Sequence, residues 1–355
     1  MIVHQWVPSA HAGDAVGDQT LVLRTLLRAL GHTSDIFAIN IDPALEDEVR
    51  PWTGADARAA DVTIFHFASP SEMSAAFGTL SRGRVLQYHN VTPAPFLAPF
   101  DQDLARLAAR ARAELGALAS RTDLAVAPSD YSRRELQALG FTRTAVLPLI
   151  VDPTRLRQAE RVPALEWILQ DGLTNILFVG RIAPNKKIED HIRLAEHYKR
   201  YVDTEYRFIF VGRTDAVPAY FEMIQGLIST YRMLPERFLF PGAVPETELA
   251  AYYRNAHAYV SLSEHEGFCV PLVEAMAMDV PVLAYAAAAV PETLGGEGVS
   301  FAPKDLEYAA ELLGALIYDE PFRAGVIDGQ RRRVRDFGRL AVEPALRQLL
   351  ETVAS

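Results

Sequence analysis

Residues 175–181 read NILFVGR, in which the apolar run 176–179 is followed by a glycine. Such a run, bounded by a turn residue, is typical of a buried strand. Apolar residues then recur at helical spacing over 188–201, and a second apolar run ends in glycine at 206–212. Strands that alternate with helices in this way predict a parallel sheet covered by helices on both faces.

The rest of the chain repeats this alternation. In the second half, further strands are expected at 238–242, 258–262 and 280–284. In the first half, strands are expected at 2–7, 62–67, 85–89, 124–127 and 145–149, and helices at 18–30 and 101–120. A polar run within 150–173 breaks the pattern and is interpreted as a connector. The sequence therefore predicts an α/β protein with two Rossmann-like, doubly wound parallel-sheet domains.

The composition is that of a soluble globular protein of 355 residues with a single cysteine. One cysteine excludes an internal disulfide framework and a cysteine-rich zinc site. The net charge of −10 argues against general nucleic-acid binding, which depends on basic side chains. No apolar run approaches the roughly 18 residues of a membrane span, and the first residues do not resemble a signal peptide. We expect a cytoplasmic protein.

A cluster of arginines interrupts the acidic background. It is interpreted either as a solvated helix face or as a surface for a membrane or an anionic acceptor. Its members are Arg106, Arg110, Arg112, Arg121, Arg133 and Arg134.

The segment 179–187, VGRIAPNKK, lies where a strand gives way to a helix. Gly180 permits a sharp turn, Arg181 can grip two phosphate oxygens, and Lys186 adds a second positive charge. Fixed cations at this point would stabilise the charge that develops on a departing diphosphate, so that no metal is needed. The alternative is an ordinary basic surface turn.

Two glutamates frame the segment 266–274, EGFCVPLVE, which follows an expected strand. The Gly-Phe pair indicates a helix start whose free N–H groups favour an anion. Eight helical residues would separate the carboxylates by roughly 12 Å. That spacing fits sugar contact by Glu266 and ribose contact by Glu274 better than the carboxyl pair of a glycoside hydrolase, about 5–10 Å apart. Because Glu274 stands among apolar residues, we expect it to be partly buried with a partner.

Three further residues are weaker candidates. His89 ends an apolar strand, where α/β sites usually form, and either contacts a substrate hydroxyl or is a structural histidine. The loop at Gly13 either brings backbone amides near a phosphate or sugar or is an ordinary loop. Cys269 is interpreted as a packing residue because nothing in the sequence points to a base that would activate it. Neither a P-loop nor a G-x-G-x-x-G motif is found in the sequence.

These motifs together resemble glycosyltransferase family 4, whose GT-B fold has two Rossmann-like domains facing a central cleft. The resemblance rests on 179–186, on 210–212, on 241–246, and above all on the E-x7-E pattern from Glu266 to Glu274. It is strong over about 175–300 and weaker over 1–150. Within the family, the chain looks similar to bacterial polysaccharide mannosyl- and glucosyltransferases.

The resemblance implies an acceptor-binding domain over 1–155, a donor-binding domain over 156–338, and a C-terminal helix over 339–355 that returns to the first domain. A helical apolar stripe at Leu346, Leu349, Leu350 and Val353 agrees with such a helix, and Pro344 suits its first turn.

The family also implies roles for individual residues. His89, Glu266, Arg181 and Lys186 would form the catalytic set. The donor-binding set would be Gly13, Gly180, Arg181, Lys186, Gly212, Val244, Glu266, Gly267, Phe268, Cys269, Val270 and Glu274. Two positions depart from the family pattern. Lys187 stands where glycine usually follows the lysine, and the first loop has Gly13 and Gly17 in place of a Gly-Gly pair.

The resemblance therefore implies a retaining hexosyltransferase that needs neither metal nor cofactor. It would move mannose or glucose from a GDP- or UDP-linked donor to a glycan or lipid-linked acceptor, in polysaccharide biosynthesis. No nucleic-acid partner is expected, and peripheral association with the cytoplasmic face of the inner membrane stays open. The alternatives are a sugar-nucleotide 2-epimerase of the same fold and a non-catalytic sugar-nucleotide-binding protein.

Overall fold

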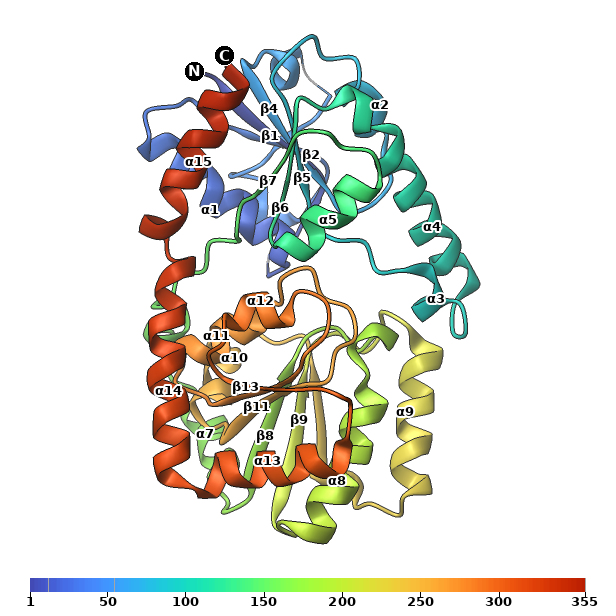
Figure 1. Ribbon diagram of the computed structural model, residues 1–355, viewed down its shortest axis with the longest axis vertical. Coiled ribbons are helices and arrows are strands. Elements are labelled where there is room, and N and C mark those ends of the chain that lie inside the picture. Colours follow the sequence, from blue (N-terminus) through green and yellow to red (C-terminus); the bar gives the residue numbers. More distant parts are fainter. Residues whose placement is uncertain (12, 54, 355) are drawn as a thin grey trace. The chain divides into compact units, whose positions relative to one another are not determined.

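The computed structural model describes residues 1–11, 13–53 and 55–354. The chain forms two compact units, drawn in Figure 1. Unit 1 comprises residues 1–95, 103–150 and those from 337 onward, and unit 2 comprises 96–102 and 151–336. Each unit contains one parallel sheet with its own helices, which confirms the predicted fold class.

Unit 1 is built on a seven-stranded parallel sheet in the order β3-β2-β1-β4-β5-β6-β7. The strands are β1 (Val3–Ala10), β2 (Ile36–Ile41), β3 (Arg50–Pro51), β4 (Val62–Phe67), β5 (Arg84–Tyr88), β6 (Leu124–Ala127) and β7 (Thr144–Val146). The helices of this part of the chain are α1 (Ala15–Ala29), α2 (Glu72–Phe77), α3 (Ala94–Leu97), α4 (Gln102–Ala117), α5 (Asp130–Ala138) and α15 (Arg339–Ala354). Short 3-10 turns lie at Pro43–Leu45, Ala55–Arg58 and Ala119–Arg121.

The two faces of this sheet are covered by different helices, because side chains alternate along each strand. On one face, Val3, Ile64 and Val126 pack against α1 and against Leu346 and its neighbours in α15. On the other face, aromatic and apolar side chains pack against α2, α4 and α5; among them are Trp6, Phe65, Phe67, Leu86, Phe77, Leu115 and Leu136.

Unit 2 is built on a six-stranded parallel sheet in the order β10-β9-β8-β11-β12-β13. The strands are β8 (Thr174–Val179), β9 (Tyr206–Val211), β10 (Phe238–Gly242), β11 (Ala258–Ser261), β12 (Val282–Tyr285) and β13 (Val299–Phe301). The helices are α6 (Arg155–Gln158), α7 (Pro163–Leu169), α8 (Ile188–Tyr201), α9 (Pro218–Thr230), α10 (Glu246–Arg254), α11 (Val270–Ala277), α12 (Val290–Leu294), α13 (Leu306–Tyr318) and α14 (Glu320–Val334). Short 3-10 turns lie at Pro184–Lys186, Pro235–Arg237 and Arg335–Phe337.

Three sequence expectations need adjustment. The connector at 150–173 contains α6 and α7, which pack on α10 of unit 2, so the chain leaves unit 1 at residue 150 rather than 155. It leaves unit 2 at 336 rather than 338.

The C-terminal helix already begins at Arg339, so Pro344 lies inside it and not in its first turn. Burial of Val342 beside Leu346 stabilises the additional helical residues that precede the proline. The expected end of that helix, residue 355, lies outside the described residues.

Within the described part of the chain, no helix has both the length and the hydrophobicity needed to cross a bilayer.

Candidate functional site

The strand order of unit 2 places a topological switch point between β8 and β11. From β8 the chain proceeds to β9 on one side, whereas β11 lies on the other side. In open α/β sheets, ligands bind beyond the carboxyl ends of the strands at such a point. The segments that follow these two strands, 180–187 and 262–269, contain most of the residues that the sequence analysis selected.

Gly180 and Gly212 end the neighbouring strands β8 and β9 and approach one another closely. A Cβ atom on Gly212 would lie 2.1 Å from the Gly180 carbonyl oxygen, and φ is 147° at Gly212. Only glycine tolerates both conditions. The Gly212 amide donates to the Gly242 carbonyl oxygen at 2.8 Å, so the ends of β8, β9 and β10 are joined. Val244 follows in the short loop before α10.

The closest contact between predicted site residues joins Lys186 to Glu266. The Lys186 ammonium donates to both carboxylate oxygens of Glu266, at 2.6 and 2.7 Å. Glu266 is 7% exposed and so depends on this partner for compensation of its charge. An ammonium has three donors, so one N–H of Lys186 remains for another acceptor. The pair is held in register because the Glu264 amide donates to the Asn185 carbonyl oxygen at 2.9 Å.

Arg181 stands five residues before Lys186 in the same segment and is exposed. Among the described residues its guanidinium has no hydrogen-bond or ion-pair partner, whereas most of the arginines of the chain contact a carboxylate. An arginine without an internal partner, in a loop beyond a parallel sheet, is available to an anionic ligand.

The second motif departs from the geometry expected for it. α11 begins at Val270, and Cys269 before it has a left-handed backbone with φ of 71°. Glu266 therefore lies in the loop before the helix, and the expected separation of 12 Å between the two glutamates along one helix is wrong. The thiol of Cys269 is buried, and burial together with the Glu266 carboxylate raises its pKa well above the usual value. Such a thiol suits packing, not nucleophilic attack.

Gly267 and Phe268 connect Glu266 to this left-handed residue. Phe268 is buried, and its carbonyl oxygen accepts a hydrogen bond from the Thr293 hydroxyl of α12. The Ala289 amide donates to the Glu266 carbonyl oxygen at 3.3 Å. The loop is thus fixed from the β12–α12 side, which holds the Glu266 backbone in place.

Glu274 on α11 is 6% exposed and has partners from two other helices. Arg155 of α6 donates to its Oε1 at 2.7 Å, and the Tyr253 hydroxyl of α10 donates to its Oε2 at 3.1 Å. The expectation that this glutamate is buried with a partner is confirmed. Burial beside Glu274 raises the pKa of Tyr253 well above its usual value, so the phenol remains a donor. Sequence reasoning missed both partners because they lie far from Glu274 in the chain.

Lys304 is another residue that sequence reasoning missed. Its ammonium donates to Asp190 Oδ2 at 2.8 Å and to the Leu262 carbonyl oxygen and Glu264 Oε1, each at 2.9 Å. These acceptors use all three donors of the ammonium and join α8 to the loop that leads to Glu266. The only signal in the sequence is an isolated lysine after Pro303 near the edge strand β13.

Lys187 has a left-handed backbone, with φ of 54° and ψ of 49°, at the start of α8. The departure from glycine noted in the sequence therefore lowers stability, because the left-handed conformation costs a non-glycine residue roughly 1–2 kcal/mol of conformational free energy. Its ammonium lies 3.4 Å from both Glu189 and Glu264, contacts that compensate only in part.

We expect Lys187→Gly to be more stable than Lys187→Ala by about 1 kcal/mol, because both variants lose the ion pairs but only glycine relieves the backbone. Urea denaturation of the full chain measures the difference. The matched control is Lys199, an exposed residue of the same helix. There the order should reverse, with alanine more stable than glycine by about 1 kcal/mol. If Lys187→Ala were as stable as Lys187→Gly, the claim that the backbone at residue 187 is strained would be wrong.

Unit 1 contains the remaining predicted site residues. Gly13, with φ of 74°, precedes α1, and its amide donates to Asp18 Oδ1 at 3.1 Å. The switch point of this sheet lies between β1 and β4, and Gly13 follows β1. His89 follows β5, the next strand along, and is half-buried. Its Nε2 lies 2.8 Å from Nδ1 of His66 on β4.

The arginine cluster of unit 1 is largely neutralised within the chain. Arg106 pairs with Asp103, Arg112 with Glu135, and both Arg133 and Arg134 with Asp130. This pairing favours the solvated helix face over a surface for anions.

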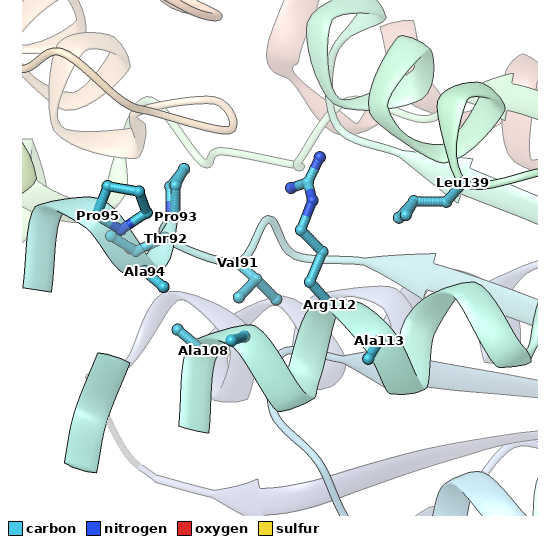
Figure 2. A pocket seen from close by; sticks show the side chains of 10 residues that line it. Val91, Thr92, Pro93, Ala94, Pro95, Ala108, Arg112, Ala113 and Leu139 are labelled. Carbon is cyan, nitrogen blue, oxygen red and sulfur yellow. The ribbon is translucent and has the colours of Figure 1, made fainter. Parts of the chain in front are cut away.

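A pocket of about 510 Å³ lies between α4 and the segment that follows β5. Its walls are mainly alanine, proline, valine and leucine side chains, and Arg112 rises from α4 between Val91 and Leu139, as Figure 2 shows. The pocket is therefore apolar with one cation, whose charge is shared with Glu135 at 3.1 Å.

Across residues 1–11, 13–53 and 55–354, no three His, Cys, Asp or Glu side chains gather as the ligands of a metal ion would.

Residues 167–333, most of unit 2, match the model of a family described as Glycosyl transferases group 1. The serotype-specific mannosyltransferase WbdA of Escherichia coli is 28% identical over 166 residues, which make up 46% of this chain and 20% of that protein. The GDP-mannose-dependent alpha-mannosyltransferase of Mycolicibacterium smegmatis is 32% identical over 246 residues, 66% of this chain and 59% of that protein. The chain thus spans about a fifth of the first relative and less than two thirds of the second.

Among solved structures, Anabaena Alr3699/HepE in complex with UDP and glucose superposes with a TM-score of 0.76. The match covers 99% of this chain and 100% of that chain at 17% identity, and it shows that the fold is shared. The family match over unit 2 and the mannosyltransferase relatives together support a glycosyltransferase.

Proposed function

We propose that this protein is a retaining, metal-independent hexosyltransferase that uses a nucleotide diphosphate sugar, with GDP-mannose the first donor to test. The observation that carries the proposal is Arg181, which has no partner among the described residues and stands in the same segment as the Lys186–Glu266 pair, at the switch point of unit 2. Mannose and GDP are proposed because relatives of this chain are named as mannosyltransferases, one of them GDP-mannose-dependent.

In the proposed reaction, the bond between the anomeric carbon and the diphosphate oxygen breaks and the electron pair leaves with the phosphate. The acceptor hydroxyl attacks the anomeric carbon from the same face, so the configuration is retained. The acceptor proton passes to the departing phosphate oxygen, and no protein base is required. The protein contributes fixed positive charge where negative charge develops, which stabilises the transition state more than the bound donor.

The side chains of unit 2 divide this task. No described residue accepts a hydrogen bond from the Arg181 guanidinium, so its donors can serve the diphosphate, and Lys186 offers the N–H that Glu266 leaves unused. Glu266, oriented by Lys186, accepts hydrogen bonds from the hydroxyls of the donor sugar. These two cations supply the charge that a divalent metal supplies in other transferases, and for that reason we propose that none is required.

Glu274 is proposed as the ligand of the ribose hydroxyls. Each carboxylate oxygen has two lone-pair directions, so the bonds from Arg155 and Tyr253 leave acceptor capacity on a carboxylate held in one orientation.

For the acceptor, we propose a glycan or lipid-linked saccharide, with the apolar pocket beside α4 receiving its apolar part. We place the reaction in bacterial polysaccharide biosynthesis, at the cytoplasmic face of the membrane.

A thermal-shift screen of the full chain tests the donor class. GDP-mannose should raise Tm by several degrees at a hundredfold excess over Kd, where ligand binding contributes about 2.7 kcal/mol, and chelation of metals by EDTA should leave the shift unchanged. UDP-, ADP- and dTDP-sugars give the comparison. A protein that no nucleotide diphosphate stabilises would refute the donor site, and a shift abolished by EDTA would refute metal independence.

NMR of the products separates the rival functions. Transfer with retention gives a new glycoside of the donor's anomeric configuration. A 2-epimerase would convert the donor into a different sugar without forming a glycoside, and a binding protein would leave the donor unchanged while still shifting Tm.

A further inference from the structure

A chain of hydrogen bonds runs through unit 1 from the backbone of α1 to His89. Gln5 Nε2 donates to the Thr20 carbonyl oxygen at 3.0 Å, and Gln5 Oε1 lies 2.9 Å from His66 Nε2. His66 Nδ1 lies 2.8 Å from His89 Nε2, and the two ring planes are inclined by 21° with centroids 5.1 Å apart. The members come from β1, β4 and the end of β5, three adjacent strands.

The strand registers explain why these side chains meet. Gln5 pairs with Ile64, and His66 pairs with Gln87. Residues two apart in a strand point to the same face, so Gln5, His66 and His89 follow one another diagonally on the face that α1 covers. Each step advances two residues toward the carboxyl ends of the strands. The chain therefore starts inside the core and ends where His89 is half-buried.

The Thr20 carbonyl sets the direction of every proton in this chain. A carbonyl oxygen only accepts, so the amide nitrogen of Gln5 must face it and the amide oxygen must face His66. That oxygen also only accepts, so His66 Nε2 carries a proton and its Nδ1 is a lone pair. His89 Nε2 must then carry a proton to donate to His66.

The neutral state of both rings follows from burial. Gln5 and His66 are fully buried. Burial lowers the pKa of His89 to about 4 and lowers the pKa of His66 well below its usual value, an effect to which the neighbouring His89 ring adds. A neutral His89 that is protonated on Nε2 has its lone pair on Nδ1. Among the described residues, this nitrogen has no hydrogen-bond partner.

We propose that Gln5 and His66 are positioning residues that fix His89 as a pure hydrogen-bond acceptor at Nδ1, directed at a hydroxyl of the sugar or glycan substrate. The inference rests on the proposed function and deepens it. An acceptor with no proton repels phosphate oxygens, which also only accept. His89 therefore selects a neutral hydroxyl group over a phosphate oxygen.

Histidine nitrogen NMR of the full chain tests the tautomers without reference to activity. Near neutral pH, two-bond proton–nitrogen correlations should show both His66 and His89 protonated at Nε2 and bare at Nδ1. Signals are assigned from the variants His66→Leu and His89→Gln. A wild-type His89 protonated at Nδ1, or cationic at neutral pH, would overturn the proposal even in a protein whose transferase activity is established.

Gln5→Leu tests the distant end of the chain. Without the amide, the proton direction is no longer set, so the spectrum should show a mixture of His89 tautomers. The kcat/KM for transfer should fall on the order of tenfold, the equivalent of one hydrogen bond. Gln87→Leu is the matched control. Gln87 is a buried glutamine on the same face, beside His66, whose amide oxygen has no partner among the described residues. This variant should keep the wild-type tautomers and rate.

The double variant Gln5→Leu/His89→Gln decides whether Gln5 acts through His89. If it does, the double variant should be no slower than His89→Gln alone, because both changes remove the same acceptor. Losses that multiply would overturn the positioning role. Absence of transfer in the wild type refutes the proposed function instead, and the tautomer measurement then still decides whether this hydrogen-bond chain is as described.

Discussion

Replacement of Arg181 by alanine should lower kcat for glycosyl transfer by about 10²–10³-fold and leave the stability of the protein within about 0.5 kcal/mol of wild type. The large kinetic effect follows from the proposed role of the guanidinium on the departing diphosphate. The small effect on stability follows from its exposure and from its lack of a hydrogen-bond partner among the described residues. Initial rates with GDP-mannose and urea denaturation measure the two quantities.

Arg213 provides the control for charge alone. It is an exposed arginine in the loop after β9, and its guanidinium is held by Asp215 at 3.0 Å. We expect Arg213→Ala to retain transfer within about threefold, since its charge is already neutralised. An Arg181→Ala enzyme that transfers at the wild-type rate would rule out Arg181 as the diphosphate ligand. Arg181→Lys should recover only part of the activity, because an ammonium cannot make the bidentate contact.

Replacement of Lys186 by methionine should affect both activity and stability. Glu266 is only 7% exposed, and the substitution removes the cation that compensates its charge. Loss of one partner from a buried ion pair costs about 3–5 kcal/mol, and the partial exposure of this pair places the expected loss near 3 kcal/mol. In a domain of this size, such a loss corresponds to a decrease in Tm of about 6–12 °C. Transfer should fall by at least about 10²-fold because Glu266 is no longer oriented.

A second substitution separates the two effects. In Lys186→Met/Glu266→Gln no charge remains to be compensated, so most of the lost stability should return while transfer stays low. A double variant as unstable as Lys186→Met would show that the cost arises from packing and not from the unpaired carboxylate. A double variant that regains transfer would contradict the assignment of both residues to the donor site.

Local patterns were enough to predict a parallel sheet in each unit and the segments that meet in unit 2, although the strands β2, β3 and β13 were not expected. The run at 175–181 and the segment 266–274 each combine strand, turn and helix signals within a few residues, so their placement beyond β8 and β11 followed from the rules of parallel sheets. The burial of Glu274 was predictable for the same reason, since its immediate neighbours are apolar.

The partners of these residues could not be predicted in the same way. Arg155 and Lys304 reach the site from positions far along the chain, and each is a single basic residue without a local pattern. The left-handed backbone of Cys269 also could not be predicted, because residues with a Cβ atom rarely adopt that conformation. It separates Glu266 from α11, so the expectation that both glutamates lie on one helix was wrong. Gln5 and His66 did leave a signal, because polar residues inside buried parallel strands need partners, but only the strand register identifies those partners.

The route of the chain through its two units has a consequence for synthesis on the ribosome. Domains usually fold from the N-terminus as they emerge. Here Val342, Leu346, Leu349 and Leu350 complete the core on one face of unit 1, and they are made only after all of unit 2. While unit 2 is being translated, the nascent first unit therefore lacks these side chains, although α1 already covers part of the same sheet face. Complete burial of this face therefore follows the synthesis of unit 2.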